Sequence, residues 1–173
     1  FMLIAAMNPC PCGYYGHPSR ECVCSQSAVY QYMNRISGPV LDRIDLHIEV
    51  EPVNFDQLSD ERRGEPSSAI RARVVRARQT QQRRFADRPG ITCNAQMDTR
   101  SLDEFCRLDD RSRALLKTAM ERLSLSARAY DRILKVSRTI ADLAERQDIA
   151  PQDVAEAIQY RSLDREGWLG QNR

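Results

Sequence analysis

Hydrophobic and polar residues follow three different patterns along this chain, and each pattern predicts a different kind of element. Residues 1–7 contain no polar side chain, which is typical of a strand buried on both faces of a sheet. Residues 44–50 alternate strictly between apolar and polar side chains, which predicts a half-buried strand near a sheet edge. A strand that is buried on both faces needs neighbouring strands and covering elements. We therefore expect the chain to be a piece of a longer protein whose other strands lie upstream.

Helical periodicity governs most of the remaining sequence. One amphipathic helix begins at Ser25 and ends at Ser37-Gly38-Pro39. After residue 66 every periodic segment is helical, with apolar residues recurring at three- and four-residue spacing. The predicted helices of this second region cover residues 67–86, 99–107, 109–123 and 126–145, and a last one begins at Pro151, a favourable first helical position.

These patterns predict a mainly α fold with a small β part. Residues 53–66 contain Asn54, Gly64 and Pro66 among charged residues, so we interpret them as a linker between two domains. The first domain covers residues 1–52 and includes a Cys-, Pro- and Gly-rich loop at 10–24. The second is a helical bundle at 67–162, and residues 163–173 form a tail.

Composition narrows the class of protein without naming a function. Of the 173 residues, 42% are apolar and 29% are charged, and the formal net charge is +2, which excludes a disordered chain or a collagen. There is no run of 18 apolar residues and no signal peptide, so we expect no membrane span and a cytoplasmic location. Nearly all basic residues are arginines, which suit phosphate contacts, although a GC-rich coding sequence would give the same bias.

Four of the six cysteines lie within fifteen residues, as the close pairs Cys10, Cys12 and Cys22, Cys24. Two such pairs can supply four sulfurs to a closed, structural zinc site. The one-residue spacing within each pair is tighter than usual, and redox-active, disulfide-bonded or incidental cysteines are the alternatives. His17 lies in the same loop and could replace one thiolate, but we expect it to remain outside the ligand set.

Three polar residues stand at positions where a phosphate could bind. Asn8 follows the first predicted strand, and ligands of open sheets bind at the carboxyl ends of strands, although a turn residue explains it as well. Arg43 precedes the second strand and could simply pair with a neighbouring acid. Arg128 lies in the first turn of a helix, where its charge opposes the helix dipole, so it calls for a bound anion or a nearby acid.

The predicted helix 67–86 contains six arginines and no acidic residue. A row of arginines on one helix face can follow a nucleic-acid backbone, although a solvated helix face is the more common explanation. The row predicted to contact DNA consists of Arg73, Arg76, Arg83 and Arg84.

Three stretches, in this order, resemble the magnesium-chelatase-like AAA+ ATPases. They are residues 5–16 (AAMNPCPCGYYG), residues 35–47 (RISGPVLDRIDLH), and residues 125–130 (LSARAY) together with 138–143 (RTIADL). The resemblance extends to about residue 162. It implies the tail of an AAA+ α/β subdomain, with a cysteine-rich insertion, followed by a helical lid.

The resemblance also implies roles for single residues. Asn8 matches the sensor 1 asparagine, which positions the attacking water. Arg43 matches the arginine finger that acts on the nucleotide of a neighbouring subunit, and Arg128 matches the sensor 2 arginine. The implied cofactors are ATP and Mg²⁺ besides the structural Zn²⁺. The implied assembly is a hexameric ring that drives DNA branch migration in transformation, whereas magnesium chelatase relatives use a similar ring to insert magnesium into protoporphyrin.

The sequence departs from the family pattern in one respect that decides activity. It contains neither the phosphate-binding motif G-x-x-x-x-G-K-[ST] nor an apolar strand ending in Asp-Glu. We therefore expect this part of an ATP hydrolase to be inactive alone. A zinc-stapled DNA- or protein-binding module without motor activity, or the ATPase subunit of a magnesium chelatase, are the alternative functions.

Overall fold

The structure, a computed structural model, describes residues 2–50, 52–53 and 64–161, all of whose regular elements are helical. Most of the predicted linker 53–66 and the tail 163–173 lie outside the described residues. Two helices belong to the first part of the chain, α1 (Gln26–Met33) and α2 (Gly38–Leu41). The second part contains α4 (Ser67–Arg84), the 3₁₀ helix η1 (Asn94–Gln96), α5 (Thr99–Phe105), α6 (Asp110–Arg122), α7 (Ala127–Leu143) and α8 (Pro151–Gln159).

The helix boundaries follow local capping chemistry. Ser25, Asp98, Asp109 and Ser126 each precede a helix, and the side chain of each accepts a hydrogen bond from the third residue along, at 2.7–3.3 Å. Such caps satisfy backbone N–H groups that have no partner inside the helix. At α8 the carboxylate of Asp153 accepts the backbone N–H of Ala150 at 2.9 Å. The predicted helices of the second region are therefore confirmed to within a few residues.

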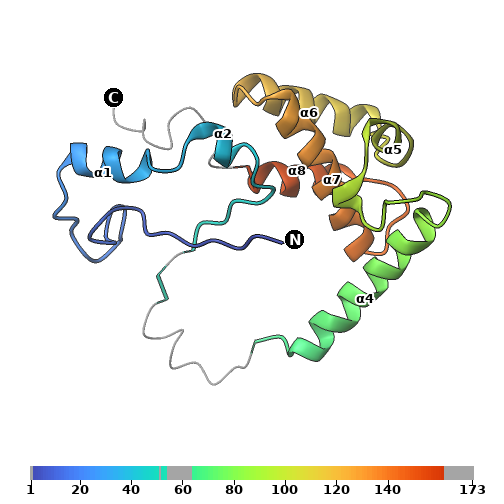
Figure 1. The fold of residues 1–173 in the computed structure, drawn as a ribbon, viewed down its shortest axis with the longest axis horizontal. Helices are drawn as coiled ribbons and strands as arrows, with labels where there is room; N and C mark the ends of the chain where they lie inside the picture. Colours follow the sequence, from blue (N-terminus) through green and yellow to red (C-terminus); the bar gives the residue numbers. More distant parts are fainter. Residues whose placement is uncertain (1, 51, 54–63, 162–173) are drawn as a thin grey trace.

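Helices α4 to α8 pack around one apolar core, while α1 and the cysteine loop lie apart from it (Figure 1). The bundle core includes Phe85, Leu116 and Ile133, together with Val154 and Ala157 of α8, as the periodicity predicts. A second, smaller cluster joins Cys10 to Val29 and Met33 of α1. No described helix is both long and apolar enough to cross a membrane.

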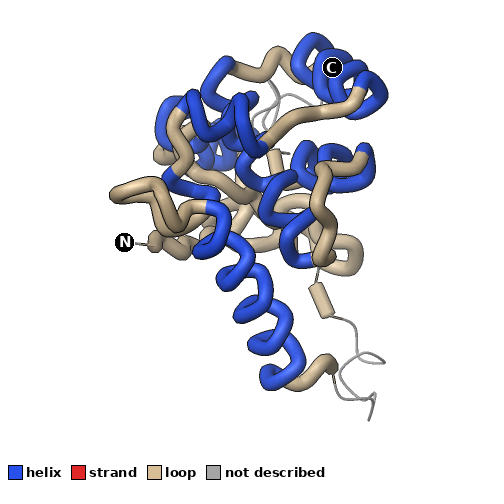
Figure 2. The backbone as a smooth tube through the Cα atoms, turned by 90° about the vertical axis from the view of Figure 1, so that its right-hand side faces the viewer, coloured by secondary structure: helices blue, strands red, loops and turns tan. Residues whose placement is uncertain are grey.

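The amino-terminal half of α4 extends away from the other helices (Figure 2). Its predicted apolar stripe is buried only at its end: Ala77 and Phe85 are 3% exposed, whereas Ile70 and Val74 are 42% and 44% exposed. Half of this helix therefore has no apolar partner in the described part of the chain.

The predicted small β part is not confirmed, because the described residues include no strand. Residues 2–7 are extended and exposed, and at 44–50 the burial does not follow the predicted alternation: His47 is buried while Leu46, Ile48 and Val50 are exposed. A strand is held by hydrogen bonds to a neighbouring strand. Here the backbone N–H of His47 donates instead to the carbonyl of Tyr160, just after α8.

Candidate functional site

The four loop cysteines meet at one point. Their sulfur atoms all lie within 4.8 Å of one another, and three of the separations are 3.3 Å (Cys10–Cys12), 3.5 Å (Cys12–Cys22) and 3.7 Å (Cys10–Cys22). Tetrahedral zinc with Zn–S bonds of about 2.3 Å would hold its sulfurs about 3.8 Å apart. All six cysteines of the chain are free thiols. The cluster is thus compatible with a bound metal and contains no disulfide.

Two glycine turns shape the cysteine loop. Gly13 and Gly16 have φ values of 83° and 76°, in the left-handed region that residues with a Cβ rarely adopt. The first turn lets the N–H of Gly13 donate to the carbonyl of Cys10 at 3.0 Å and the N–H of Tyr15 donate to the sulfur of Cys10 at 3.3 Å. Backbone N–H groups around sulfur are a common feature of cysteine metal sites because they stabilise thiolates.

The thiols of the cluster differ in acidity. A hydrogen bond from the backbone of Tyr14 is the main cause that lowers the pKa of Cys12 to about 6. The backbone N–H of Cys24 favours the thiolate of Cys22, but burial and the neighbouring sulfurs together raise the pKa of Cys22 to about 12. Several negative sulfurs in so small a volume repel one another, and a cation between them would remove that repulsion.

His17 does not join the four sulfurs. Its Nδ1 accepts the backbone N–H of Ser19 at 3.2 Å, and its ring lies edge-on to Tyr14 with centroids 5.7 Å apart. Among the described residues, the group whose ligand atoms could hold a metal ion consists of the four cysteines and does not include His17.

Asp42, which precedes Arg43 in the sequence, contacts Arg128 although 86 residues separate them. The carboxylate of Asp42 accepts from the hydroxyl of Ser126 at 2.9 Å and from Nη1 of Arg128 at 3.0 Å. Partial burial opposes ionisation of Asp42, but these two hydrogen bonds and the nearby positive charges outweigh it and lower its pKa. Arg128 therefore has the nearby acid that its place at a helix start requires.

Arg43 itself points to solvent beside this contact. It is exposed, and its Nη1 donates to the carbonyl of Pro39 in α2 at 2.8 Å. Asn8 is also exposed and stands just before the cysteine loop. The structure does not bring Asn8 into hydrogen-bond contact with Arg43 or Arg128.

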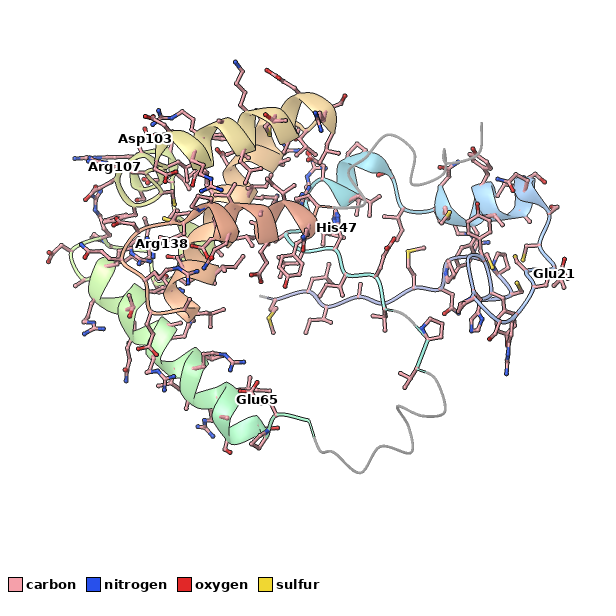
Figure 3. The ribbon with its side chains drawn as sticks, turned by 180° about the vertical axis from the view of Figure 1, so that it is seen from behind. Glu21, His47, Glu65, Asp103, Arg107 and Arg138 are labelled. Carbon is pink, nitrogen blue, oxygen red and sulfur yellow. The ribbon has the colours of Figure 1, made fainter. Side chains whose placement is uncertain are left out.

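Further contacts attach the segment after α2 to the bundle. Arg132 of α7 donates from Nε to the carbonyl of Asp42 at 3.1 Å and pairs with Asp45. Arg161, 1% exposed, donates to the carbonyl of Ile44. His47, labelled in Figure 3, lies beside the end of α8. No contact of Asp42 with Ser126 or Arg128 was predicted from the sequence; the only signal was position, since Asp42 adjoins Arg43 and Ser126 lies two residues before Arg128.

The four α4 arginines predicted to contact DNA do not form one free row. Arg73 pairs with Glu65 at 2.7 Å, at the start of α4 (Figure 3), and Arg76 pairs with Glu145 at 2.7 Å. Arg83 donates only to the hydroxyl of Thr80, at 3.3 Å, whereas Arg84 is bound inside the protein. Their availability to a ligand therefore differs from residue to residue.

Arg84 belongs to a buried polar network that sequence reasoning missed. The fully buried carboxylate of Asp142 pairs with Arg84 at 2.5 Å and with Arg138 at 3.1 Å, and it accepts Nδ2 of Asn94 at 2.8 Å. Arg138 also donates to the carbonyls of Arg146 and Gln147, at 2.7 and 2.6 Å. The signal was present in α7, where Arg138 and Asp142 are spaced i, i+4 on a face that otherwise carries apolar residues.

Comparison with known proteins agrees with the resemblance of the motifs. Residues 1–58 match the family model "Magnesium chelatase, subunit ChlI", and residues 64–161 match "Magnesium chelatase, subunit ChlI C-terminal". The chain is 42% identical over 167 residues to Competence protein ComM of Haemophilus influenzae and 39% identical over 167 residues to the uncharacterized protein YifB of Escherichia coli. Each alignment covers 95% of this chain and 31% of the relative.

A more distant relative, an uncharacterized protein of Mycobacterium tuberculosis, is 35% identical over 162 residues, or 93% of this chain. The chain again spans 31% of that protein's length. The two family models together cover both parts of the chain, from the extended amino-terminal segment to the end of the bundle. The chain therefore belongs to the magnesium chelatase subunit ChlI family.

Proposed function

We propose that this chain is the carboxyl-terminal part of a ComM-like AAA+ ATPase that assembles into a hexameric ring and uses ATP, bound with Mg²⁺, to move along DNA in transformation or recombination. The family membership and the similarity to Competence protein ComM support this proposal. The sequence contains no phosphate-binding loop, so the chain supplies residues that act on the nucleotide and not the pocket that holds it.

The observation that carries the proposal is the contact of Asp42 with Ser126 and Arg128. It joins the residue before Arg43 to the first turn of α7, where Arg128 lies, and this supports assigning both arginines to the nucleotide chemistry. In this proposal Arg43, which is exposed, reaches the nucleotide of a neighbouring subunit and offsets charge that develops during phosphoryl transfer. Arg128 serves as sensor 2 beside it.

Asn8 has the sensor 1 role in this proposal, orienting the water that attacks the terminal phosphate. Its carboxamide is exposed and lies next to a loop that the four cysteines shape. A structural zinc ion held by Cys10, Cys12, Cys22 and Cys24 fixes that loop and takes no part in the chemistry, because four protein sulfurs leave no open position on the metal. Thiolate ligands suit a reducing compartment, which supports a cytoplasmic location.

The same fold serves two other candidate functions. The family model also describes the ATPase subunit of a magnesium chelatase, and Arg83, which has no acidic partner among the described residues, favours a DNA-binding module without motor activity. The similarity to a competence protein favours the DNA motor over magnesium insertion.

The test is Arg43→Ala in a protein that joins this chain to a phosphate-binding loop. We expect the turnover number for ATP to fall about a thousandfold or more, the range that an arginine finger contributes, while nucleotide affinity stays within a few-fold. Arg35→Ala is the matched control, since Arg35 is exposed in the same segment and lies over the ring of Tyr32.

The 173-residue chain alone is expected to hydrolyse no ATP. Turnover by this chain that Arg43→Ala abolishes, or an Arg43→Ala turnover number within tenfold of the parent in the longer protein, would contradict the proposal.

A further inference from the structure

A groove of about 720 Å³ lies between the carboxyl-terminal half of α4, the end of α5, and the α7–α8 connection. Arginines reach it from each of these elements. Arg107 follows α5, and Arg138 of α7 lies deeper in the molecule (Figure 3). The arginines that line the groove are Arg76, Arg83, Arg84, Arg107, Arg138 and Arg146. Only three of the four α4 arginines predicted from the sequence are among them.

The rim of the groove carries cations without a neutralising partner. Within the described residues, Arg83 donates only to Thr80, and Arg107, which is exposed, makes no ion pair. Three acidic side chains of the lining are already paired, Glu104 with Arg88, Glu145 with Arg76 and Asp142 with its two arginines. Six arginines and four acids line the groove, so positive charge exceeds negative charge there.

The floor of the groove also holds excess positive charge, on side chains that are largely buried from solvent. Arg84 and Arg138, whose side chains are 12% and 4% exposed, share the single carboxylate of Asp142. Burial is the main cause that lowers the pKa of Arg138, which indicates that its charge is poorly solvated. A buried cation that lacks a full counter-charge is stabilised by an anion brought close to it.

The chemistry of the lining favours phosphodiester oxygens as the ligand. Guanidinium groups bind phosphate through two parallel N–H donors, and a string of them at the rim of a groove can follow a backbone. Proteins that bind single strands commonly use a positively charged groove that follows the backbone. Phe105, which is partly buried, also lines the groove.

We propose that this groove binds the phosphate backbone of a single-stranded nucleic acid, with Arg83 and Arg107 as the contacts at the rim and the buried Arg84 and Arg138 supplying positive charge at the floor. The inference rests on the DNA partner in the proposed function and assigns it a site. It requires neither ATP nor the ring, so it can be tested with this chain alone.

The test measures fluorescence anisotropy of a labelled oligo-dT of about 15 nucleotides, at several salt concentrations, against the chain and two double variants. Arg83→Gln with Arg107→Gln removes the rim contacts. We expect its dissociation constant to rise at least about tenfold and its salt slope to fall by about 1.4, since each phosphate contact on a single strand contributes about 0.7.

The matched control is Arg71→Gln with Arg78→Gln. These arginines lie seven residues apart on the same helix, both are exposed, and neither lines the groove, so the charge change is equal and the position differs. The control should bind within about threefold of the parent chain. All four side chains are exposed, and thermal melting should confirm that both doubles fold.

Three results would overturn the inference. One is no measurable binding of oligo-dT, and another is equal weakening by the two doubles, which would indicate general attraction to a basic surface. The third is tight binding of a DNA duplex of the same length, with an affinity that the variant Arg83→Gln with Arg107→Gln does not change. None of these results bears on Arg43, so failure of the groove and failure of the ATPase proposal remain distinguishable.

Discussion

Asp142 shows what one buried charge does in this fold. Its carboxylate lies on the carboxyl-terminal part of α7 and accepts hydrogen bonds from three side chains, those of Arg84, Asn94 and Arg138. A buried ion pair adds little net stability when complete, because desolvation offsets most of the attraction. Removing one partner of the pair is strongly destabilising, since it leaves the other charge buried without a counter-charge.

Asp142→Asn is therefore expected to lower the free energy of unfolding by about 3–5 kcal/mol, because Arg84 and Arg138 lose their only shared anion. Denaturant unfolding followed by circular dichroism measures the change. Glu145→Gln is the matched control three residues away: its pair with Arg76 is exposed on both sides (62% and 54%), so we expect a loss below about 1 kcal/mol. Equal losses of stability in the two variants would show that burial does not determine how much these ion pairs contribute to the free energy of unfolding.

Single residues were predictable where their partners are close in sequence. Cys10, Cys12, Cys22 and Cys24 share one loop, so their spacing alone predicts that the sulfurs meet. The acid beside Arg128 was one of two open alternatives, and its identity as Asp42 depends on a contact across 86 residues. The buried position of Arg84 was not predictable for the same reason, since nothing in the sequence of α4 distinguishes it from the exposed arginines of that helix.

At the scale of elements, the segment after α2 holds the bundle by polar contacts. Asp42 accepts from Ser126 and Arg128, Asp45 pairs with Arg132, and the N–H of His47 donates to Tyr160. Each contact meets an end of α7 or α8. The position of Arg43 relative to Arg128 consequently depends on a few hydrogen bonds and not on a shared apolar core.

Asp42→Asn is expected to lower the free energy of unfolding by about 1–2 kcal/mol at pH 7, because hydrogen bonds to a charged group are lost. The folded state lowers the pKa of Asp42, so its contribution is complete above the ordinary aspartate value of about 4 and is lost as pH falls through the lower folded value. The parent and the variant should thus differ between pH 5 and 8 and converge at lower pH.

Denaturant titrations at pH 7 and about pH 3 measure this convergence. Asp131→Asn, an exposed acid on the same helix α7, is the control and should change stability by less than about 0.5 kcal/mol. A difference between parent and Asp42→Asn that grows toward low pH would have the wrong sign and contradict the assignment.

The helices were predictable as elements and the strands were not, for one physical reason. A helix makes its backbone hydrogen bonds within itself, so periodicity and caps such as Asp98 and Asp109 suffice to locate it. A strand needs another strand beside it, and residues 2–7 and 44–50 have none in the described residues. Alternation at 44–50 accordingly did not decide which side chains are buried.

On the scale of the whole molecule, stability has two separate sources. The bundle is held by an apolar core from Phe85 to Ala157, whereas the first part has only Cys10, Val29 and Met33 buried against one another. So small a cluster stabilises little, and domains of this size commonly need a metal or a disulfide. A change of composition at residues 53–66 predicts a domain boundary there, whereas the unequal burial of the two parts becomes visible only in the packing.

Removing zinc should therefore affect one part only. The chain purified without added metal should contain about one zinc per molecule, and Cys22→Ser with Cys24→Ser should contain none, while Cys93→Ser retains it because Cys93 lies outside the cluster. Elemental analysis measures the content. Because the two cores are separate, a chelator should leave the main helical melting temperature within about 2 °C.

Two results would contradict this interpretation: unchanged metal content in the double cysteine variant, or a chelator that lowers the melting temperature of the bundle by many degrees. The first would remove the cysteines as ligands, and the second would mean that the cysteine loop supports the bundle core.

The pair between Arg84 and Asp142 also determines how α4 can dock. Only Ala77 and the following Phe85 bury apolar surface along this helix, and so short a contact would tolerate sliding. A slip of one helical turn, however, would set Thr80 opposite Asp142 and leave the carboxylate with only Asn94 and Arg138 as partners. The buried ion pairs thus allow only one register for α4, whose apolar contacts are too few to define a register by themselves. The same ion pairs therefore also determine the direction of the exposed amino-terminal half of α4.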